Sequence, residues 1–361
     1  MTLDQLLDQP LSGWMNETGF QGDIVLSSRI RLARNLAGIP FPHRANEQAL
    51  LDVVTFLRQS VPDLSNHGEG QYMFIEMEKL QPLERHILVE KHIVSPNHIQ
   101  EPRHRALMIR EDAAVSIMIN EEDHLRIQCL MPGLNLEQTL TLAQQVDDIL
   151  ESRHTFAFHE QAGYLTACPT NVGTGLRASV MLHLPALSIT KQMNRIVGAV
   201  TQIGLAVRGL YGEGTEAVGN VYQVSNQITL GQSEEEIIDN LQTVVQQLVD
   251  QERGAREALM REAPITIADR AWRAYGALRY AQTISGQEAL SLLSEVRLGI
   301  DLNLIKEVAS RTFNELLVVT RPNFLQKIAH KTEFQPAERD VFRAQVIREK
   351  LIPLQGGKHN V

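Results

Sequence analysis

The stretch Ser116-Ile-Met-Ile-Asn-Glu-Glu-Asp-His124 decides the fold expected for this chain. Apolar side chains alternate from Ala113 to Ile119, and a second apolar run goes from Leu125 to Leu130. Two such runs separated by five polar residues predict a β-hairpin with the acidic cluster at its turn. An isolated Glu-Glu-Asp is most often a solvated surface turn, so the case for a functional site depends on the motifs elsewhere in the chain.

Composition limits the classes of protein to consider. The chain has 361 residues, 43% of them hydrophobic, which is enough for two domains with proper cores. No run approaches the ~20 apolar residues of a membrane helix, and the N-terminus lacks a signal peptide, so we expect a soluble, cytoplasmic protein. Two cysteines, Cys129 and Cys168, fit a reducing compartment. A net charge of −9 argues against direct nucleic-acid binding, so any anion site must be a local cluster of arginines.

The first such cluster lies in Asp23–Asn35. The alternation of apolar and polar residues predicts a strand that points Arg29 and Arg31 to the same face. Two guanidinium groups on one face can bind a multiply charged oxyanion. Taken alone, the pattern would favour a solvent-facing strand with basic side chains.

The intervening segments show ordinary periodicities. Apolar spacing predicts helices over 45–61, 83–93 and 136–149, and a strand over 72–77. Pro96 ends the second helix, because the residue before a proline is disfavoured in helical conformation.

A glycine-containing loop follows, Thr166-Ala-Cys-Pro-Thr-Asn-Val-Gly-Thr-Gly-Leu-Arg177, between strand-like segments 164–167 and 178–184. Its glycines allow backbone amides to turn toward a phosphate or a substrate. It is not a Walker loop, because no Gly-Lys-Ser/Thr follows. Cys168 is a candidate reactive thiolate if guanidinium groups lie nearby, although a lone cysteine is more often buried and inert.

A longer glycine-rich connection spans Arg208–Asn226, between strands expected at 203–207 and 220–230. Such a connection can close over a substrate. Ser233 followed by three glutamates then predicts a helix that runs on to Arg256.

Four motifs, in this order, resemble the guanidino (phosphagen) kinase family: Ser28-Arg-Ile-Arg31, Asn120-Glu-Glu-Asp-His-Leu-Arg126, Cys168-Pro-Thr-Asn-Val-Gly-Thr-Gly-Leu-Arg177, and Arg208-Gly through Ser225-Asn226. The resemblance implies that five arginines hold the phosphates of ATP: Arg29, Arg31, Arg126, Arg177 and Arg208. It further implies ATP contacts from Ser28, His92 and Glu213. The catalytic residues that it implies are Glu122, Glu213, Cys168 and Arg126. Mg²⁺ is expected to be held through the ATP phosphates, without direct protein ligands.

The chemistry of the acceptor restricts the role of the carboxylates. Removing a proton from a guanidinium with a pKa near ~13.8 at pH 7 would cost about 9 kcal/mol. We therefore expect Glu122 and Glu213 to align the guanidinium, with Glu122 accepting a proton late, as the N–P bond forms. Cys168, as a thiolate, is expected to lie close to the same guanidinium.

The sequence also departs from the family pattern. Members that act on small guanidino compounds carry a helical domain before the first motif, whereas here that motif begins at Ser28. Met181 replaces an adenine-contacting histidine, with His183 two residues on, and Gln223 stands where an aspartate is common. These departures leave the adenosine contacts open.

Beyond Arg256, helices are expected over 267–281, 287–298, 302–317 and 337–351. A helical appendix behind a kinase-like domain resembles the McsB-type bacterial protein arginine kinases. The resemblance implies that Arg339, Asp340 and Arg343 form an allosteric phosphoarginine-binding site. The alternative from spacing alone is an ordinary surface ion pair between Asp340 and Arg343.

We expect an α+β fold, with a phosphagen-kinase-like catalytic domain over 1–256, built on a curved antiparallel sheet flanked by helices, and a helical dimerisation and regulatory domain over 257–361. The expected reaction transfers the γ-phosphoryl group of ATP to protein arginine side chains. The resemblance implies a homodimer, a zinc-binding McsA-type activator, a Clp ATPase that degrades marked clients, and a CtsR-type heat-shock repressor as a target. Two alternatives remain open: a kinase for free arginine and a non-catalytic phosphoarginine-binding adaptor.

Overall fold

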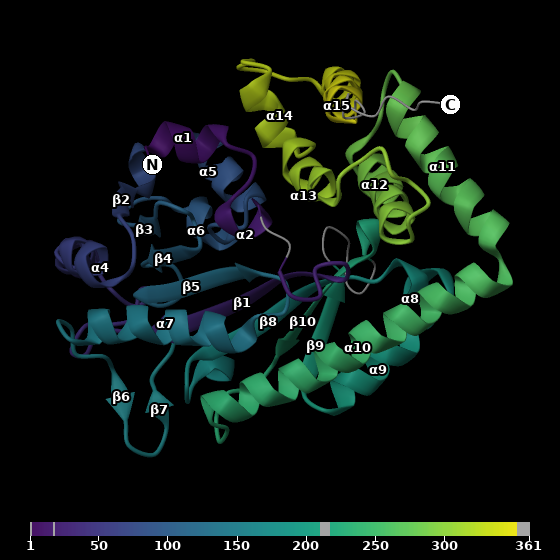
Figure 1. Ribbon diagram of the computed structural model, residues 1–361. Coiled ribbons are helices and arrows are strands. Elements are labelled where there is room, and N and C mark those ends of the chain that lie inside the picture. The colour runs from purple at the N-terminus through teal and green to yellow at the C-terminus, as the bar shows by residue number, and fades with distance from the viewer. Residues whose placement is uncertain (1, 17–18, 210–216, 352–361) are drawn as a thin grey trace. The chain divides into compact units, whose positions relative to one another are not determined.

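The computed structural model describes residues 2–16, 19–209 and 217–351 (Figure 1). The chain divides into two compact units. The first comprises Met1–Leu182, Asn194–Val207 and Gln223–Val249, and the second comprises His183–Met193, Arg208–Tyr222 and Asp250–Val361. The long helix α10 (Glu234–Glu262) contributes to both units and continues through the domain boundary expected at residue 256.

An eight-stranded sheet has the order β2-β3-β4-β5-β1-β8-β10-β9. Its strands are β1 (Val25–Arg34), β2 (Tyr72–Glu76), β3 (Ala106–Arg110), β4 (Val115–Ile119), β5 (Leu125–Pro132), β8 (Leu176–His183), β9 (Leu205–Gly209) and β10 (Val221–Asn226). From β2 to β8, neighbouring strands pair antiparallel. A separate two-stranded sheet joins β6 (Phe158–His159) to β7 (Gly163–Tyr164). The expected mixture of helices and antiparallel sheet is confirmed.

The hairpin expected from the opening motif is present. Ile119 at the end of β4 pairs with Leu125 at the start of β5, so the polar residues form the turn. Asn120 adopts a left-handed φ of 57°, and its side-chain amide donates to the carbonyls of Leu50 and His104. Asparagine tolerates the left-handed conformation better than most residues. The two side-chain bonds hold the beginning of the acidic turn against the segments that contain Leu50 and His104.

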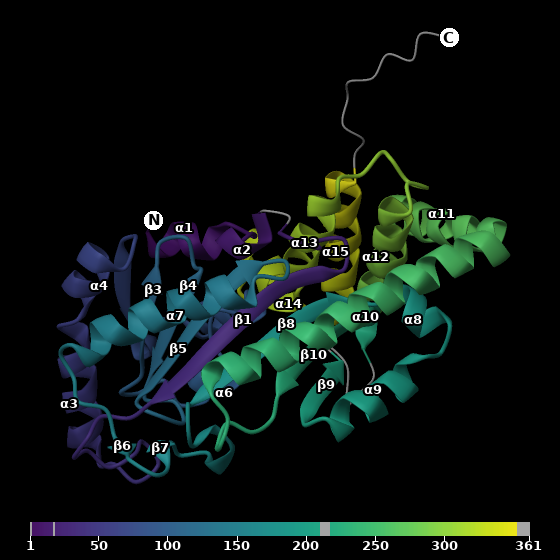
Figure 2. The same ribbon diagram turned by 60° about the horizontal axis from the view of Figure 1, so that its bottom comes forward.

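One long helix covers one face of the sheet. Helix α7 (Leu136–Glu151) lies along β1 and β5 (Figure 2). The Ser28 hydroxyl donates to the Gly133 carbonyl and accepts from the Asn135 amide, just before this helix. Since successive strand residues point to opposite faces, Arg29 and Arg31 must point away from α7.

Shorter helices complete the first unit. They are α1 (Leu3–Asp8), α2 (Gly13–Asn16), α3 (Glu47–Arg58), α4 (Val61–His67), α5 (Pro82–Glu90), α6 (Pro96–Gln100) and most of α9 (Met193–Gln202). The buried ammonium of Lys91, after α5, donates to the carbonyls of Leu6 and Gln9 and so ties α1 to α5.

The second unit is mainly helical. It contains α8 (Pro185–Ile189), a 3₁₀ turn η3 (Val218–Asn220), α11 (Pro264–Tyr280), α12 (Gly286–Asp301), α13 (Ser310–Val319), α14 (Pro322–Ile328) and α15 (Pro336–Lys350). Helix α12 packs against α11, α13, α8 and η3. The buried Ser294 hydroxyl of α12 binds both His183 and Asn220, at 2.8 Å each.

One helix prediction was wrong in this region. The helix expected over 302–317 begins only at Ser310. Asn303 has a left-handed φ of 58°, and the amides of Leu304 and Ile305 bond back to the Gly299 carbonyl. This arrangement closes α12 and stops helical propagation, as left-handed C-terminal caps do. In the part of the chain that the structure covers, no helix combines the length and apolar character needed to cross a membrane.

Candidate active site

Four of the five expected arginines lie on one face of three adjacent strands. In β1, Arg31 pairs with Arg177 of β8 and with Gln128 of β5. Arg126 pairs with Ala33, two residues along from Arg31. Because paired residues and residues two apart share a face, Arg29, Arg31, Arg126 and Arg177 all lie on the side opposite α7. We call these four residues the arginine face.

The arginine face concentrates positive charge that the surrounding chain only partly offsets. Burial, together with repulsion from Arg177 and Arg126, lowers the pKa of Arg29 to about 10. The same causes, with repulsion from Arg29, hold the pKa of Arg31 well below its usual value. For the buried Nε of Arg31, the described residues supply no hydrogen-bond partner. A bound polyanion would offset the repulsion among these guanidinium groups, so the site fits a phosphate chain.

Arg29 is oriented by neutral groups. Its Nη2 donates to the Gln223 side-chain oxygen at 2.8 Å, and its Nε donates to the Ser179 hydroxyl at 3.2 Å. A neutral amide positions the guanidinium without cancelling its charge. Gln223, which departs from the family pattern, therefore leaves the full charge of Arg29 available to a ligand.

Arg126 is held between two carboxylates of the hairpin turn. Its Nη1 lies 2.6 Å from Glu121, whose side chain is 2% exposed, and its Nη2 lies 2.9 Å from Glu122, whose side chain is 42% exposed. The Ser95 hydroxyl donates to the other oxygen of Glu121 at 2.5 Å. The buried Glu121 thus fixes Arg126, while the exposed Glu122 remains accessible to an acceptor.

A third carboxylate joins the hairpin turn to the Cys168 loop. The buried Asp123 accepts bonds from the Ala167 amide at 2.7 Å and from the Asn35 side chain at 2.6 Å. Burial raises the pKa of Asp123, and these two hydrogen bonds oppose the rise. Asn35 also accepts from the His124 amide at 2.9 Å. Asp123 therefore brings the loop with Cys168 next to Glu122.

Cys168 is half-buried at the start of its loop. Its Sγ lies 3.1 Å from the Thr170 hydroxyl, and its carbonyl accepts from the Thr166 hydroxyl. Gly173 and Gly175 both have positive φ, and a Cβ at either would lie within 3 Å of neighbouring backbone. Only glycine suits these positions, as the sequence suggested.

The structure also brings His92 to the arginine face. The side-chain amide of Gln128, on the same face as Arg126, donates to the carbonyls of His92 and Ile93. His92 has a left-handed φ of 59°, and its ring packs edge-on against Trp14 at 6.3 Å between centroids. The segment after α5 is therefore fixed over the sheet beside the arginines.

The remaining expected site residues are Ser28, Arg208 and Glu213. The Ser28 side chain is fully buried on the α7 face, so its hydroxyl cannot contact a ligand at the arginine face. Arg208 is exposed on β9 and is grouped with the second unit. Glu213 lies outside the described residues.

Of the three residues expected to bind phosphoarginine, Arg343 is already occupied by contacts within the protein. Arg343 is buried, and its guanidinium donates to the carbonyls of Thr320 at 2.9 Å and Ile284 at 2.8 Å. It also pairs with Asp340. Arg343 therefore does not offer the open fork expected from helical spacing. Arg339 is half-buried, and its Nε has no bond within the described chain.

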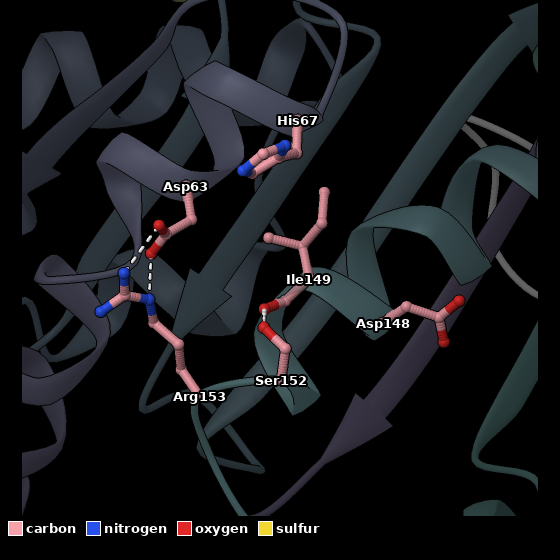
Figure 3. A pocket seen from close by; sticks show the side chains of 6 residues that line it. All are labelled: Asp63, His67, Asp148, Ile149, Ser152 and Arg153. Atoms are coloured by element: carbon pink, nitrogen blue, oxygen red, sulfur yellow. Dashed lines mark hydrogen bonds and ion pairs between the residues drawn. The ribbon is translucent and has the colours of Figure 1, made fainter.

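A separate pocket of about 570 Å³ lies between α4 and the end of α7 (Figure 3). It is lined by Asp63, His67, Asp148, Ile149, Ser152 and Arg153. Asp63 pairs with Arg153, with 2.7 Å between Oδ1 and Nη2. Every lining residue belongs to α4 or to α7 and the residues directly after it, so none comes from the arginine face.

The sequence motifs did not single out Glu121, Asp123, Asn35 or Gln128 for a role. Their functions depend on burial and on partners far away in the chain. One feature of the sequence could have indicated these roles: the turn carries three carboxylates in a row. Aligning the acceptor does not require all three, so some of them could be expected to have a structural role.

Comparison with known proteins identifies the family. Residues 52–255 match the ATP:guanido phosphotransferase C-terminal catalytic domain, and residues 264–360 match the protein-arginine kinase McsB C-terminal domain. The chain is 49% identical over 358 residues to a protein-arginine kinase of Bacillus subtilis, covering 99% of this chain and 98% of that protein. It is 53% identical over 341 residues to one of Moorella thermoacetica, covering 94% and 97%.

Solved structures of two guanidino kinases have a fold similar to that of this chain. The fold is similar to that of a lombricine kinase, with a TM-score of 0.57 and 26% identity, covering 67% of this chain and 70% of the other. A duplicated taurocyamine kinase from Schistosoma mansoni gives a TM-score of 0.58 and 25% identity, covering 72% and 39%. The arginine face, the hairpin carboxylates and the near full-length similarity lead to one conclusion: the chain belongs to the protein arginine kinases, a branch of the ATP:guanido phosphotransferases.

Proposed function

We propose that this chain transfers the γ-phosphoryl group of ATP to arginine side chains of proteins. The observation that carries the proposal is the arginine face, whose Arg126 is paired with the accessible Glu122. Phosphoryl transfer relies on positioning and on charge stabilisation, and converging guanidinium groups supply both. The half-buried Cys168, held beside the hairpin turn through Asp123, completes the acceptor side.

In the proposed reaction, the arginine face orients the phosphates in line with an acceptor nitrogen. Glu122 aligns the acceptor guanidinium by accepting hydrogen bonds from it. The N–P bond forms as the bond to the ADP oxygen breaks, and the proton lost by the nitrogen passes to Glu122. Glu213 is proposed as a second aligning carboxylate and Arg208 as a fifth phosphate ligand. Mg²⁺ bound to the ATP phosphates would neutralise part of their charge.

Incubation with γ-labelled ATP, offering an unfolded protein and free arginine in parallel reactions, tests the activity. We expect label on the protein that is lost in acid and kept in base, as a phosphoramidate requires. Equal labelling of free arginine would support a small-molecule kinase. Binding of phosphoarginine without any label transfer would support an adaptor.

We also propose the cellular context that the resemblance implies: a cytoplasmic homodimer that works with a zinc-binding activator, marks clients for a Clp protease and inactivates a heat-shock repressor. We propose Arg339 and Asp340 as the accessible part of a regulatory phosphoarginine site. Support comes from the matched C-terminal domain and from the unbonded Nε of Arg339. Sedimentation of the purified chain and its co-purification with a candidate activator test the first two of these partners.

A further inference from the structure

Two large apolar side chains stand exposed beside the Cys168 loop. Ile228 is 58% exposed and Leu230 is 54% exposed, whereas Thr229 between them is 2% exposed. The Thr229 hydroxyl bonds to the carbonyls of Val172 at 2.7 Å and Thr170 at 3.2 Å. Thr229 therefore faces the loop, and its two neighbours face solvent. We call Ile228, Thr229 and Leu230 the docking strip.

The docking strip is fixed close to the acceptor side of the site. Thr170, which accepts from Thr229, also lies 3.1 Å from the Cys168 sulfur through its own hydroxyl. At Gly173, a Cβ would lie 2.9 Å from the Cα of Leu230, so loop and strip pack backbone to backbone. Only Thr170 lies between the strip and Cys168 along this line of contacts.

Negative charge follows the apolar pair. Glu235 and Glu236 are exposed in the first turn of α10, five and six residues after Leu230. The Ser233 amide donates to Glu236 at 2.8 Å, and the Ser233 hydroxyl accepts from the Glu236 amide, which fixes this turn. An apolar pair next to exposed carboxylates complements a cationic, apolar ligand.

We propose that the docking strip binds the polypeptide that flanks the target arginine, and that it selects unfolded, arginine-containing segments. Contacts through Thr170, the Cys168 loop and Asp123 connect the strip to the turn that carries Glu122, so we expect the polypeptide around an arginine bound there to reach the strip. A folded protein keeps its apolar residues buried, and a free amino acid has no flanking chain, so neither gains from this contact. This inference rests on the proposed function, and it adds that the kinase prefers arginines in unfolded segments.

The test compares three acceptors in the full-length chain: reduced and carbamidomethylated ribonuclease A, native ribonuclease A, and N-acetyl-arginine amide. Ile228→Ser and Leu230→Ser should each lower kcat/KM for the unfolded protein about fivefold to tenfold, mainly through KM, since each loses about half the value of burying its side chain. Activity on N-acetyl-arginine amide and ATP affinity should stay unchanged. Ile265→Ser is the matched control, because Ile265 is an isoleucine, 83% exposed, on α11.

Equal losses on the unfolded protein and on N-acetyl-arginine amide would overturn the inference, because the strip would then act on the reaction itself. Unchanged kinetics with all acceptors would also overturn it. A lower sedimentation mass for Leu230→Ser would instead assign the strip to contacts between copies of the chain. If the parent phosphorylates no acceptor, the proposed function fails; if it does and the variants do not discriminate, only the docking strip fails.

Discussion

The half-buried Arg126 and the buried Glu121 form an ion pair, with 2.6 Å between Nη1 and Oε2. The pair fixes one guanidinium of the arginine face to the hairpin turn that also carries Glu122. Glu121→Gln keeps the shape and removes the charge, so Arg126 should lose its fixed orientation. We expect the KM for ATP to rise and kcat/KM to fall by about 10- to 100-fold, because small misplacements near the reacting atoms are costly.

Glu122→Gln, in the same turn, should lower kcat and leave ATP binding nearly unchanged. The Glu122 carboxylate is exposed and aligns the acceptor in the proposed reaction, so kcat should fall by at least about 100-fold while ATP affinity is largely kept. Glu160→Gln, an exposed glutamate, is the control. If both turn variants changed KM and kcat alike, the division of labour between Glu121 and Glu122 would be wrong.

Gln223 should be intolerant of a negative charge. Gln223→Glu would place a carboxylate 2.8 Å from the Arg29 guanidinium, in place of a neutral amide. The new ion pair should raise the pKa of Arg29 and compete with phosphate, weakening ATP binding about tenfold, the effect of roughly 1.4 kcal/mol. Isothermal titration with an ATP analogue measures this. Gln223→Met, with no charge, should weaken binding less, and tighter binding in Gln223→Glu would contradict the assignment.

Stability should fall as the pH drops from 7 to 5. Burial lowers the pKa of His124 to about 4 and that of His98 to about 3, against an ordinary value near 6.5. The unfolded chain therefore takes up protons below pH 6.5 that the folded chain excludes. Each ring should cost about 2 kcal/mol of the free energy of unfolding at pH 5, a loss that grows until the pH reaches the folded-state pKa.

Urea unfolding between pH 7 and 5 checks this expectation. His124→Asn removes one buried ring, whose Nδ1 accepts from the Leu36 amide and whose Nε2 donates to the Pro40 carbonyl. This variant should show a shallower pH dependence. His67→Gln is the control, because its ring is exposed. A pH profile of His124→Asn that parallels the parent would exclude His124 as a source of the acid sensitivity.

Local periodicity was enough to place Arg29 and Arg31, two of the four residues of the arginine face, on one side of a strand. Period-two alternation put Arg29 and Arg31 on one side of β1, and the hairpin followed from two apolar runs around a polar turn. The pairing of β1 with β5 and β8 could not be derived, since it depends on long-range register. Roles that depend on burial were missed for the same reason: Glu121 and Asp123 differ from Glu122 only in what surrounds them.

In the helical region the local pattern was predicted correctly, but the inference that the Arg343 guanidinium is free to bind a ligand was wrong. Arg339 and Arg343 do lie four residues apart on α15. Helical spacing predicts which residues share a face but not whether that face is covered. The carbonyls of Thr320 and Ile284, from two other segments, occupy the Arg343 guanidinium.

The last prediction follows from that burial. Arg343→Met should destabilise the second unit by about 3 kcal/mol or more, because it leaves the carbonyls of Thr320 and Ile284 unpaired and Asp340 without its partner. Arg339→Met should cost less than about 1 kcal/mol, since its side chain is half-buried and makes no ion pair among the described residues. Thermal unfolding followed by circular dichroism compares the two.

Phosphoarginine titration then separates regulation from stability. Arg339→Met and Asp340→Asn should lower the response of the kinase to phosphoarginine at a temperature where both remain folded, while ATP affinity stays that of the parent. Asp340→Asn keeps the size of the side chain and a hydrogen-bond acceptor for Arg343. If Arg339→Met responds to phosphoarginine like the parent, α15 holds no regulatory site, and the cluster serves only to join α15 to the carbonyls beneath it.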